Sequence, residues 1–332
     1  QGTDEDSVKT RRFAYVCMTI VAQFYYEYLQ DYVQVLFQLT VGAIKGDVEE
    51  VSHYAIEFWN TLCDTEVNIA YDVKQCENNG TQPEQPCKHF VRAAIKHLIP
   101  VVFEAMCKQS EDDEEGSLCV QAACCMQLCG QLVGDDILQF VMPLVMNNIQ
   151  HQDWHLREAA TYSFGAIMDG CSVDKVGQYA NQSLPTLVQM LKEEVHDKTR
   201  ETAAWTLSRV TEYQYDAIPR ESMDHIVRAA LVGLNDKQGG VCAQCCTILH
   251  KIGVHQDDGE DNVQTNILSN YFNPVLQELT KTSGRQDHEE HNLRMTSHEA
   301  LNVWIENCAN DCLPTIQQLL PPMLARLSGT MG

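Results

Sequence analysis

The sequence predicts an all-α solenoid, a protein made of stacked pairs of antiparallel helices. The segment Arg157–Phe164 returns in near copy as Arg200–Leu207, 43 residues later. Helical hydrophobic patterns alternate with short breaks nearly from end to end, whereas the period-two alternation and hairpin turns of β proteins are absent from the sequence. A fixed period in this range, with two helical patterns in each period, is typical of HEAT or armadillo repeats, which we expect to form a right-handed superhelix.

The individual helices follow from apolar residues spaced three and four positions apart. In chain order we expect helices at 8–29, 32–45, 47–66, 88–108, 118–133, 136–150, 154–169, 180–194, 198–213, 223–235, 240–253, 264–281, 291–308 and 313–328. Several begin with capping residues. Asp47 and Glu50 form a pair resembling a capping box, and Asp153 and Asp197 precede their helices.

Three segments interrupt the helical pattern and predict loops. Residues 76–87 are rich in Asn, Gly, Gln and Pro, which favour turns. Residues 110–117 form an acidic loop between two helices, and residues 256–261 form a second one. Taken alone, each charge run fits a solvated loop as well as it fits a contact with a basic partner.

Composition narrows the classes of partner. The chain has 332 residues, with 46 acidic against 23 basic side chains and a formal charge of −23. This balance argues against nucleic acid or an anionic membrane surface and favours basic partners. We expect one continuous array over residues 1–332. Because the chain begins without Met, within or just before a helical pattern, we also expect it to be an excised piece of a longer array.

The 15 cysteines predict reduced thiols rather than a disulfide framework or a metal site. Many lie inside apolar helical patterns, where cysteine acts as a small apolar residue, as expected of a cytosolic or nuclear protein. Cys242 and Cys245 have the spacing of a zinc or redox site, but no second pair stands at a suitable distance. With no phosphate-binding loop, zincin motif or nucleophile elbow, the sequence predicts neither an enzyme nor a cofactor.

Helical geometry separates a buried face from a free one in the helix after Asp197. Ala203, Leu207 and Val210 follow the spacing of a buried stripe, and each repeats an apolar residue 43 positions earlier. At about 100° per residue, Trp205 lies roughly 165° from the centre of that stripe. A tryptophan opposite its own core either packs on a neighbouring repeat or meets a ligand.

The helix after Asp47 shows the same division. One face carries Val51, Ala55, Phe58 and Leu62. Glu57, Asn60 and Asp64 lie on the opposite face, with the two carboxylates seven residues apart. Such a pair can bind a basic helix laid across several repeats, although single carboxylates are more often ordinary surface residues.

Four stretches of the sequence resemble the importin beta, or karyopherin beta, family of nuclear import receptors. They are Ile56–Asp64, Asp153–Gly165, Glu201–Thr206 and Asn292–Arg294, in the family's order and with similar spacing. The resemblance implies a middle piece of a HEAT superhelix with A helices on the convex side and B helices on the concave side. The B helices would begin near residues 47, 118, 154, 198, 240 and 291.

The resemblance also implies a function. In the family the concave face holds the basic importin-beta-binding segment of importin alpha, or basic cargo, and positions matching Glu57, Asp64 and Trp205 take part; we add Asn60 to this surface. The five acids match the family's acidic loop, which contacts both the adaptor and the GTPase Ran and couples Ran-GTP binding to release. These acids are Glu111, Asp112, Asp113, Glu114 and Glu115.

The family passes through nuclear pores by binding phenylalanine-glycine nucleoporins in apolar slots between A helices. Its members occur in the cytoplasm, in the nucleus and at the pores of the nuclear envelope. Leu36, Phe37 and Leu39 lie in a suitable helix, but core packing explains each of them equally well or better. The family's best-known slot is built largely from the helix just before residue 1, so we expect this piece to bind nucleoporins weakly.

The sequence departs from the family at two positions. Ser117 and Thr247 stand where tryptophans are usual, so we expect a bound segment to depend more on charge and less on stacking. The alternative is another HEAT scaffold, such as a different karyopherin or a phosphatase scaffolding subunit. The five-acid insertion between the helices of one repeat favours the import receptor, because phosphatase scaffolds are more uniform arrays of shorter repeats.

Overall fold

The computed structural model describes residues 5–83, 85–110, 117–256, 263–287 and 289–318. The described residues form α-helices and short 3-10 helices and contain no strand, so the all-α prediction is confirmed. By its internal contacts the chain divides into two compact units, residues 1–176 and 177–332.

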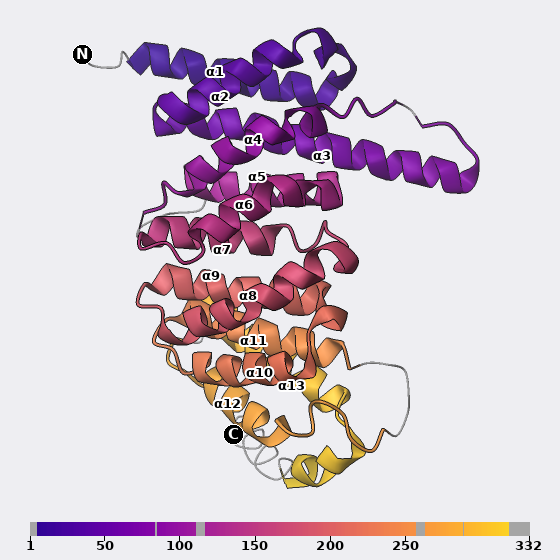
Figure 1. Cartoon of the computed structure of the whole chain (residues 1–332), viewed down its shortest axis with the longest axis vertical. Helices are drawn as coiled ribbons and strands as arrows, with labels where there is room; N and C mark the ends of the chain where they lie inside the picture. Colours follow the sequence, from indigo (N-terminus) through magenta and orange to yellow (C-terminus); the bar gives the residue numbers. More distant parts are fainter. Residues whose placement is uncertain (1–4, 84, 111–116, 257–262, 288, 319–332) are drawn as a thin grey trace, which may run out of the picture. The chain divides into compact units, whose positions relative to one another are not determined.

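The first unit is a double layer of helices (Figure 1). One layer contains α1 (Glu5–Phe24), α3 (Glu49–Asn79), α5 (Leu118–Val133) and α7 (Trp154–Ala166), each packed on the next. The other contains α2 (Val33–Gly46), α4 (Phe90–Met106) and α6 (Leu138–Asn148). The 3-10 helices η1 (Tyr26–Asp31) and η2 (Gly134–Ile137) connect α1 to α2 and α5 to α6. Alternation between two layers is the arrangement expected of stacked helix pairs.

The second unit repeats this arrangement. Helices α9 (Asp197–Tyr213), α11 (Gly239–Val254) and α13 (Leu293–Glu306) pack side by side. They are accompanied by α8 (Val173–Glu193), whose first turn belongs to the first unit, and by α10 (Arg220–Gly233) and α12 (Phe272–Ser283). The connections contain the 3-10 helices η3 (Tyr215–Ala217), η4 (Glu290–Asn292) and η5 (Asn310–Cys312).

The core lies between the two layers of each unit and contains the predicted stripes. Ala203, Leu207 and Val210 are fully buried, as are the corresponding residues of α7. On α3, all four predicted core residues have no exposed surface. Two buried tryptophans satisfy their indole N–H groups: Trp59 donates to Thr40 Oγ1 at 2.9 Å, and Trp304 donates to the carbonyl of Leu249 at 2.7 Å.

Three predicted boundaries are wrong by seven residues or more. α3 continues to Asn79, well past the expected end at 66, and stops only where Gly80 adopts a left-handed conformation with φ of 67°. A third of the expected loop at 76–87, residues 76–79, is therefore helix. α8 begins at Val173 rather than near 180. α12 begins at Phe272 rather than near 264.

Side-chain hydrogen bonds explain the late start of α12. The Asn266 side chain accepts from the backbone N–H of Leu268 at 2.9 Å, and the Asn266 N–H donates to Ser269 Oγ at 3.1 Å. These local bonds compete with the helical pattern and form a turn instead. Of the last predicted helix, residues 313–318 are helical and the remainder lies outside the described residues.

One segment, Leu118–Asn148, is long and apolar enough by length and composition to cross a membrane. It comprises α5, η2 and α6, and sequence analysis did not single it out. Gly134, at φ of 67°, breaks it into two helices of different layers. Helix α5 packs against α3 and α4, and α6 packs against α7, so both contribute to the core of the first unit.

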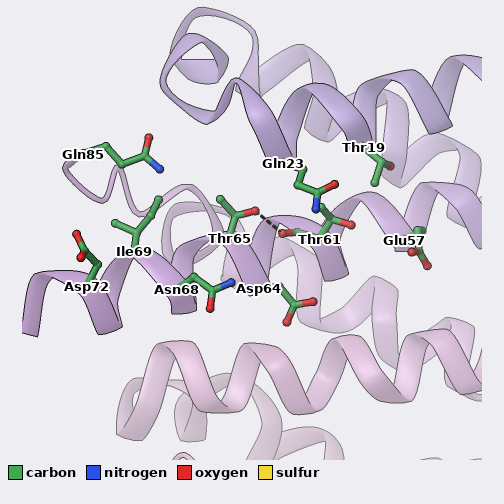
Figure 2. A pocket seen from close by; sticks show the side chains of 10 residues that line it. All are labelled: Thr19, Gln23, Glu57, Thr61, Asp64, Thr65, Asn68, Ile69, Asp72 and Gln85. Carbon is green, nitrogen blue, oxygen red and sulfur yellow. Dashed lines mark hydrogen bonds between the residues drawn. The ribbon is translucent and has the colours of Figure 1, made fainter. Parts of the chain in front are cut away.

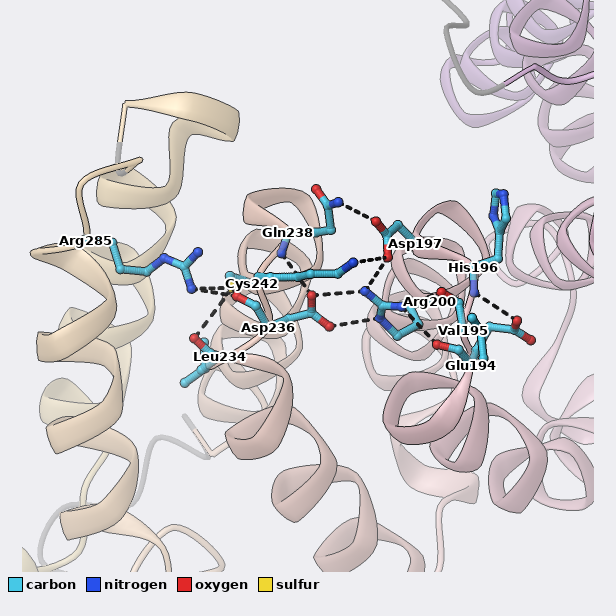
Figure 3. Close-up of polar contacts among 11 residues, drawn as sticks. Glu194, Val195, His196, Asp197, Arg200, Leu234, Asp236, Gln238, Cys242 and Arg285 are labelled. Carbon is cyan, nitrogen blue, oxygen red and sulfur yellow. Dashed lines mark hydrogen bonds and ion pairs between the residues drawn. The ribbon is translucent and has the colours of Figure 1, made fainter.

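A buried arginine, Arg200, joins successive helices of the α9 layer (Figure 3). Arg200 Nε and Nη2 donate to the two carboxylate oxygens of Asp236 at 2.9 and 3.1 Å, and Nη2 also donates to Asp197 at 2.7 Å. Arg200 Nη1 donates to the carbonyl of Glu194, just after the end of α8, at 2.9 Å. A fork-shaped guanidinium suits this task because it binds a carboxylate with two parallel hydrogen bonds.

Candidate functional site

A polar pocket opens between α1 and α3 in the first unit (Figure 2). Its volume is about 560 Å³. The lining residues are Thr19 and Gln23 of α1, Glu57, Thr61, Asp64, Thr65, Asn68, Ile69 and Asp72 of α3, and Gln85 of the following loop. This lining includes three carboxylates and no Lys, Arg or His.

The three carboxylates follow one face of α3. Glu57, Asp64 and Asp72 are separated by seven and eight residues, about 1.9 and 2.2 helical turns, so they lie on the same side of the helix. At about 1.5 Å per residue they span roughly 22 Å along the helix. Figure 2 shows Glu57 and Asp72 toward opposite ends of the pocket, with Asp64 between them. The pocket is therefore an extended strip of negative charge rather than a point site.

The electrostatics of the strip favour a cationic ligand. Asp64 is exposed, yet partial desolvation raises the pKa of its carboxyl group. Burial, followed by the charges of Glu57 and Asp64, raises the pKa of the Cys124 thiol on α5, so the field of the strip reaches the neighbouring helix. A bound cation would favour the ionised form of these carboxylates.

Asn60 does not line the pocket, although sequence analysis placed it with Glu57 and Asp64. Its side chain is 8% exposed, and Nδ2 donates to the carbonyl and to Oε1 of Gln121 at 3.3 and 3.1 Å. Asn60 thus connects α3 to α5. Its Oδ1 is buried and has no partner among the described residues. Its contact with a ligand stays a prediction.

Trp205 lies on α9, in the second unit, and is half-buried. The guanidinium carbon of Arg209 lies 5.9 Å from the centre of its ring and 4.3 Å from the centre of the Tyr213 ring. Glu212 accepts from Lys251 of α11 at 2.7 Å and lies 3.7 Å from Arg209. The indole that was predicted to meet a ligand's cation therefore already has a cation of its own chain beside it.

The structure brings only part of the predicted site together. Glu57 and Asp64 share one pocket, and Trp205 belongs to the other unit. The acidic run Glu111–Glu115 lies outside the described residues. Sequence analysis missed Asp72 because it ended the helix at 66. The continued spacing of carboxylates beyond Asp64 was the signal that could have found it.

A second pocket, of about 460 Å³ and mostly apolar, lies between α2 and α4. Its lining residues are Val33, Gln34, Phe37, Gln38, Trp59, Phe90, Ala93, Ala94 and His97. The Phe37 and Trp59 rings meet edge to face with centres 5.8 Å apart. Phe37 is half-buried and contributes to both the pocket wall and the packing on Trp59, whereas Leu39 is 51% exposed.

No group of three or more metal-ligating side chains in the described ranges is arranged to hold a metal ion. The thiols of Cys242, Cys245 and Cys246 are buried within α11, and all 15 cysteines are free. Cys242 Sγ donates to the carbonyls of Leu234 and Asp236 at 3.5 and 3.3 Å, which places it in the packing between repeats.

Two family models match the chain. One, described as importin subunit beta-1-like TPR repeats, matches residues 225–332, and one described as a HEAT-like repeat matches residues 154–210. Importin subunit beta-1 of Arabidopsis thaliana is 31% identical over 100% of this chain, and that of Schizosaccharomyces pombe is 31% identical over 97%. The chain spans 38% and 37% of the length of these two relatives.

Solved structures agree with the sequence matches. A crystal structure of importin beta in an ammonium sulfate condition has a TM-score of 0.89 at 30% identity, covering 99% of this chain and 38% of its own. A Kap95:Nup1 complex and a structure of Kap95p with RanGDP each have a TM-score of 0.88 at 26% identity, covering 100% of this chain and 37% and 38% of theirs. The HEAT-repeat solenoid predicted from the sequence is confirmed.

Proposed function

Because the chain belongs to the importin beta family, to which it is homologous over its whole length, we propose that it is part of a nuclear transport receptor. The strip of Glu57, Asp64 and Asp72 binds a basic segment, either the importin-beta-binding segment of importin alpha or basic cargo. Ran-GTP displaces that segment. The protein acts by binding, not by catalysis, and moves between cytoplasm and nucleus through the pores of the nuclear envelope.

The observation that carries this proposal is the pocket between α1 and α3, with three carboxylates and no basic side chain in its lining. An amphipathic basic helix repeats its cations every seven or eight residues along one face, which matches the spacing of the three acids. Charge-assisted hydrogen bonds from Arg or Lys to these carboxylates would give orientation as well as affinity. The formal charge of −23 adds long-range attraction for a basic partner.

The release step involves the acidic run Glu111–Glu115, which we propose as the element that couples Ran binding to departure of the basic segment. A run of five acids offers one binding surface to two basic partners, so occupation by one excludes the other. The relative Kap95p has been solved with RanGDP, which supports Ran as the GTPase concerned.

A second candidate interaction is with nucleoporins. The apolar pocket between α2 and α4 has a volume and lining suited to an aromatic side chain such as phenylalanine, with Phe37 and Trp59 as ring partners. The complex of the relative Kap95 with Nup1 supports this partner class. The pocket is separate from the acidic strip, so both ligands can bind at once.

The test is a pull-down with an immobilised basic importin-beta-binding peptide, followed by addition of Ran loaded with GTP or GDP. We expect the chain to be retained and then released by Ran-GTP. Retention should be lost in a variant carrying Glu57→Lys and Asp64→Lys. The matched control carries Glu27→Lys and Asp174→Lys, which change the net charge equally at exposed residues outside the pocket. Failure to bind Ran in either nucleotide state would favour a different HEAT scaffold.

A further inference from the structure

Three thiols meet in the core of the first unit, between α3 and α5. Cys63 of α3 and Cys125 and Cys129 of α5 have no exposed surface. The Cys63 and Cys129 sulfurs are 3.8 Å apart, in direct contact across the two helices. Cys125 lies one helical turn from Cys129 and forms hydrogen bonds with both other thiols. The transport function makes no use of this cluster.

The thiols are not equivalent. Hydrogen bonds from Cys125 and Cys63 lower the pKa of Cys129. The hydrogen bonds of Cys63 with Cys125 and Cys129, followed by burial, raise the pKa of Cys63. The cluster therefore has one sulfur that ionises in preference to its neighbours. Because the thiolate is the nucleophilic form, Cys129 is the sulfur of this cluster that would react first with an oxidant reaching it.

We propose that the cluster of Cys63, Cys125 and Cys129 is an oxidation site at which hydrogen peroxide converts the Cys63–Cys129 pair into a disulfide joining α3 to α5. A disulfide has a sulfur–sulfur distance of about 2.05 Å, so the two atoms must approach by roughly 1.8 Å from their present contact. Side-chain rotation and a small shift of the helices supply a movement of that size.

The chemistry has two steps. The Cys129 thiolate attacks one oxygen of the peroxide, an S–O bond forms, the O–O bond breaks, and the departing hydroxide takes up a proton as water. The Cys63 sulfur then attacks the sulfenic sulfur of Cys129, forming the S–S bond and breaking the S–O bond. The second hydroxide takes the Cys63 proton, so two thiols and one peroxide give one disulfide and two waters.

The position of the pair gives the disulfide a consequence for the acidic strip. Cys63 directly precedes Asp64, and the Asn60–Gln121 contact joins the same two helices one turn away. A covalent bond at this level fixes α3 against α5 beneath the pocket. Oxidation would thus limit the adjustment of the strip to its ligand, an effect that rests on the proposed function, whereas the oxidation itself does not.

The test is disulfide mapping on the folded, unmodified chain. The protein is treated with hydrogen peroxide, alkylated, digested without reduction and analysed by mass spectrometry. We expect a linked peptide pair containing Cys63 and Cys129, formed within one molecule and lost after dithiothreitol. Exposed Cys17 and Cys124 report whether the oxidant was active. Free Cys63 and Cys129 after both exposed thiols have been oxidised, or a link confined to other cysteines, would overturn the proposal.

Two variants sharpen the assignment. Cys63→Ala should abolish the disulfide between α3 and α5. Cys125→Ala should retain it, because the sulfur of Cys125 is not part of the Cys63–Cys129 pair. Loss of the link in both variants, with native helicity by circular dichroism, would contradict the pairing. Should either variant fail to fold, the mapping on the unmodified chain still decides the outcome.

Discussion

Arg200 and Asp236, 36 residues apart, are joined by two parallel hydrogen bonds of 2.9 and 3.1 Å between the guanidinium and the carboxylate. Arg11 and Asp47, also 36 residues apart, are joined in the same way at 2.7 and 2.8 Å. In both pairs the arginine lies in one helix of a layer and the aspartate directly before the next. The same pairing therefore occurs once in each unit and connects two successive repeats there.

Removing the Arg200 side chain should strongly destabilise the second unit. Arg200 is 8% exposed, and its loss removes two hydrogen bonds from Asp236 and one from the carbonyl of Glu194. Breaking a buried pair from one side costs about 3–5 kcal/mol. Urea unfolding of Arg200→Ala should show this loss, whereas Lys9→Ala, at an exposed pair with Glu5, should change the free energy of unfolding by less than about 0.5 kcal/mol. Equal effects would refute the structural role of Arg200.

Asp72 should contribute to binding of a basic segment even though it lies beyond the helix predicted from the sequence. Asp72→Lys should weaken the affinity roughly threefold or more, since exposed charge pairs contribute up to about 1 kcal/mol. Glu77→Lys, on the exposed part of the same helix but outside the pocket lining, is the matched control. Fluorescence anisotropy with a labelled basic peptide measures both, and equal affinities would remove Asp72 from the site.

Binding to the strip should also depend steeply on salt. Ser117 and Thr247 stand where tryptophans are usual in the family. We therefore expect the contact between the chain and a basic segment to depend mainly on charge. Interactions between exposed charges are screened over about 10 Å at 0.1 M salt and about 3 Å at 1 M. A peptide affinity that hardly changes between these concentrations would argue against an interaction dominated by the three carboxylates.

Glu66 should make stability depend on pH. Its buried carboxylate accepts from Tyr26 Oη at 2.7 Å and from the Phe90 N–H at 2.6 Å, and burial raises its pKa above the ordinary 4.5. A raised pKa in the folded state favours folding below pH 4.5, and this contribution is lost as the pH rises through the folded value.

The stability of the chain relative to Glu66→Gln should therefore be greatest below pH 4.5 and decrease as the pH rises. Urea unfolding of both proteins across pH 4–8 measures the difference, in which the titration of all other groups cancels. A difference that is constant, or that grows with pH, would show that the hydrogen bonds to Glu66 outweigh its desolvation.

Gly170 should not tolerate a side chain. A Cβ atom at this position would lie 2.0 Å from the carbonyl oxygen of Gly130, a backbone atom of α5. Gly170→Ala should therefore destabilise the first unit by about 1–3 kcal/mol or more. Gly42→Ala is the control, because nothing lies within 4 Å of its Cβ and the exposed helical position should gain about 0.5–1 kcal/mol. Thermal unfolding distinguishes the two, and a neutral Gly170→Ala would mean that the backbones separate readily.

Much of the fold was predictable because core residues recur with the repeat. The stripe through Ala203, Leu207 and Val210 is buried as the 43-residue period required. Helix boundaries were less predictable where local side-chain hydrogen bonds compete with helix formation, as at Asn266. They were also less predictable where a helix continues with mostly polar residues, as α3 does between residue 66 and Asn79. Hydrophobic periodicity carries no signal for a helix with little buried surface.

Two of the three carboxylates of the site were predictable, but its surroundings were not. Glu57 and Asp64 follow from helix geometry alone, and both line the pocket. The burial of Asn60 depends on Gln121 of another helix, and the cation beside Trp205 depends on how Arg209 folds back over two rings. Such contacts depend on packing and rotamers, which helical spacing does not specify.

A charge-swap cycle tests the central claim most directly. The affinity of the chain and of its Glu57→Lys, Asp64→Lys variant is measured for a basic helical peptide and for the same peptide with two arginines seven residues apart changed to glutamate. The account predicts that either change alone weakens binding about tenfold or more and that the two together restore most of the affinity. If the losses of binding free energy from the two changes simply add, the result would contradict a direct pairing between the acidic strip of α3 and a basic partner.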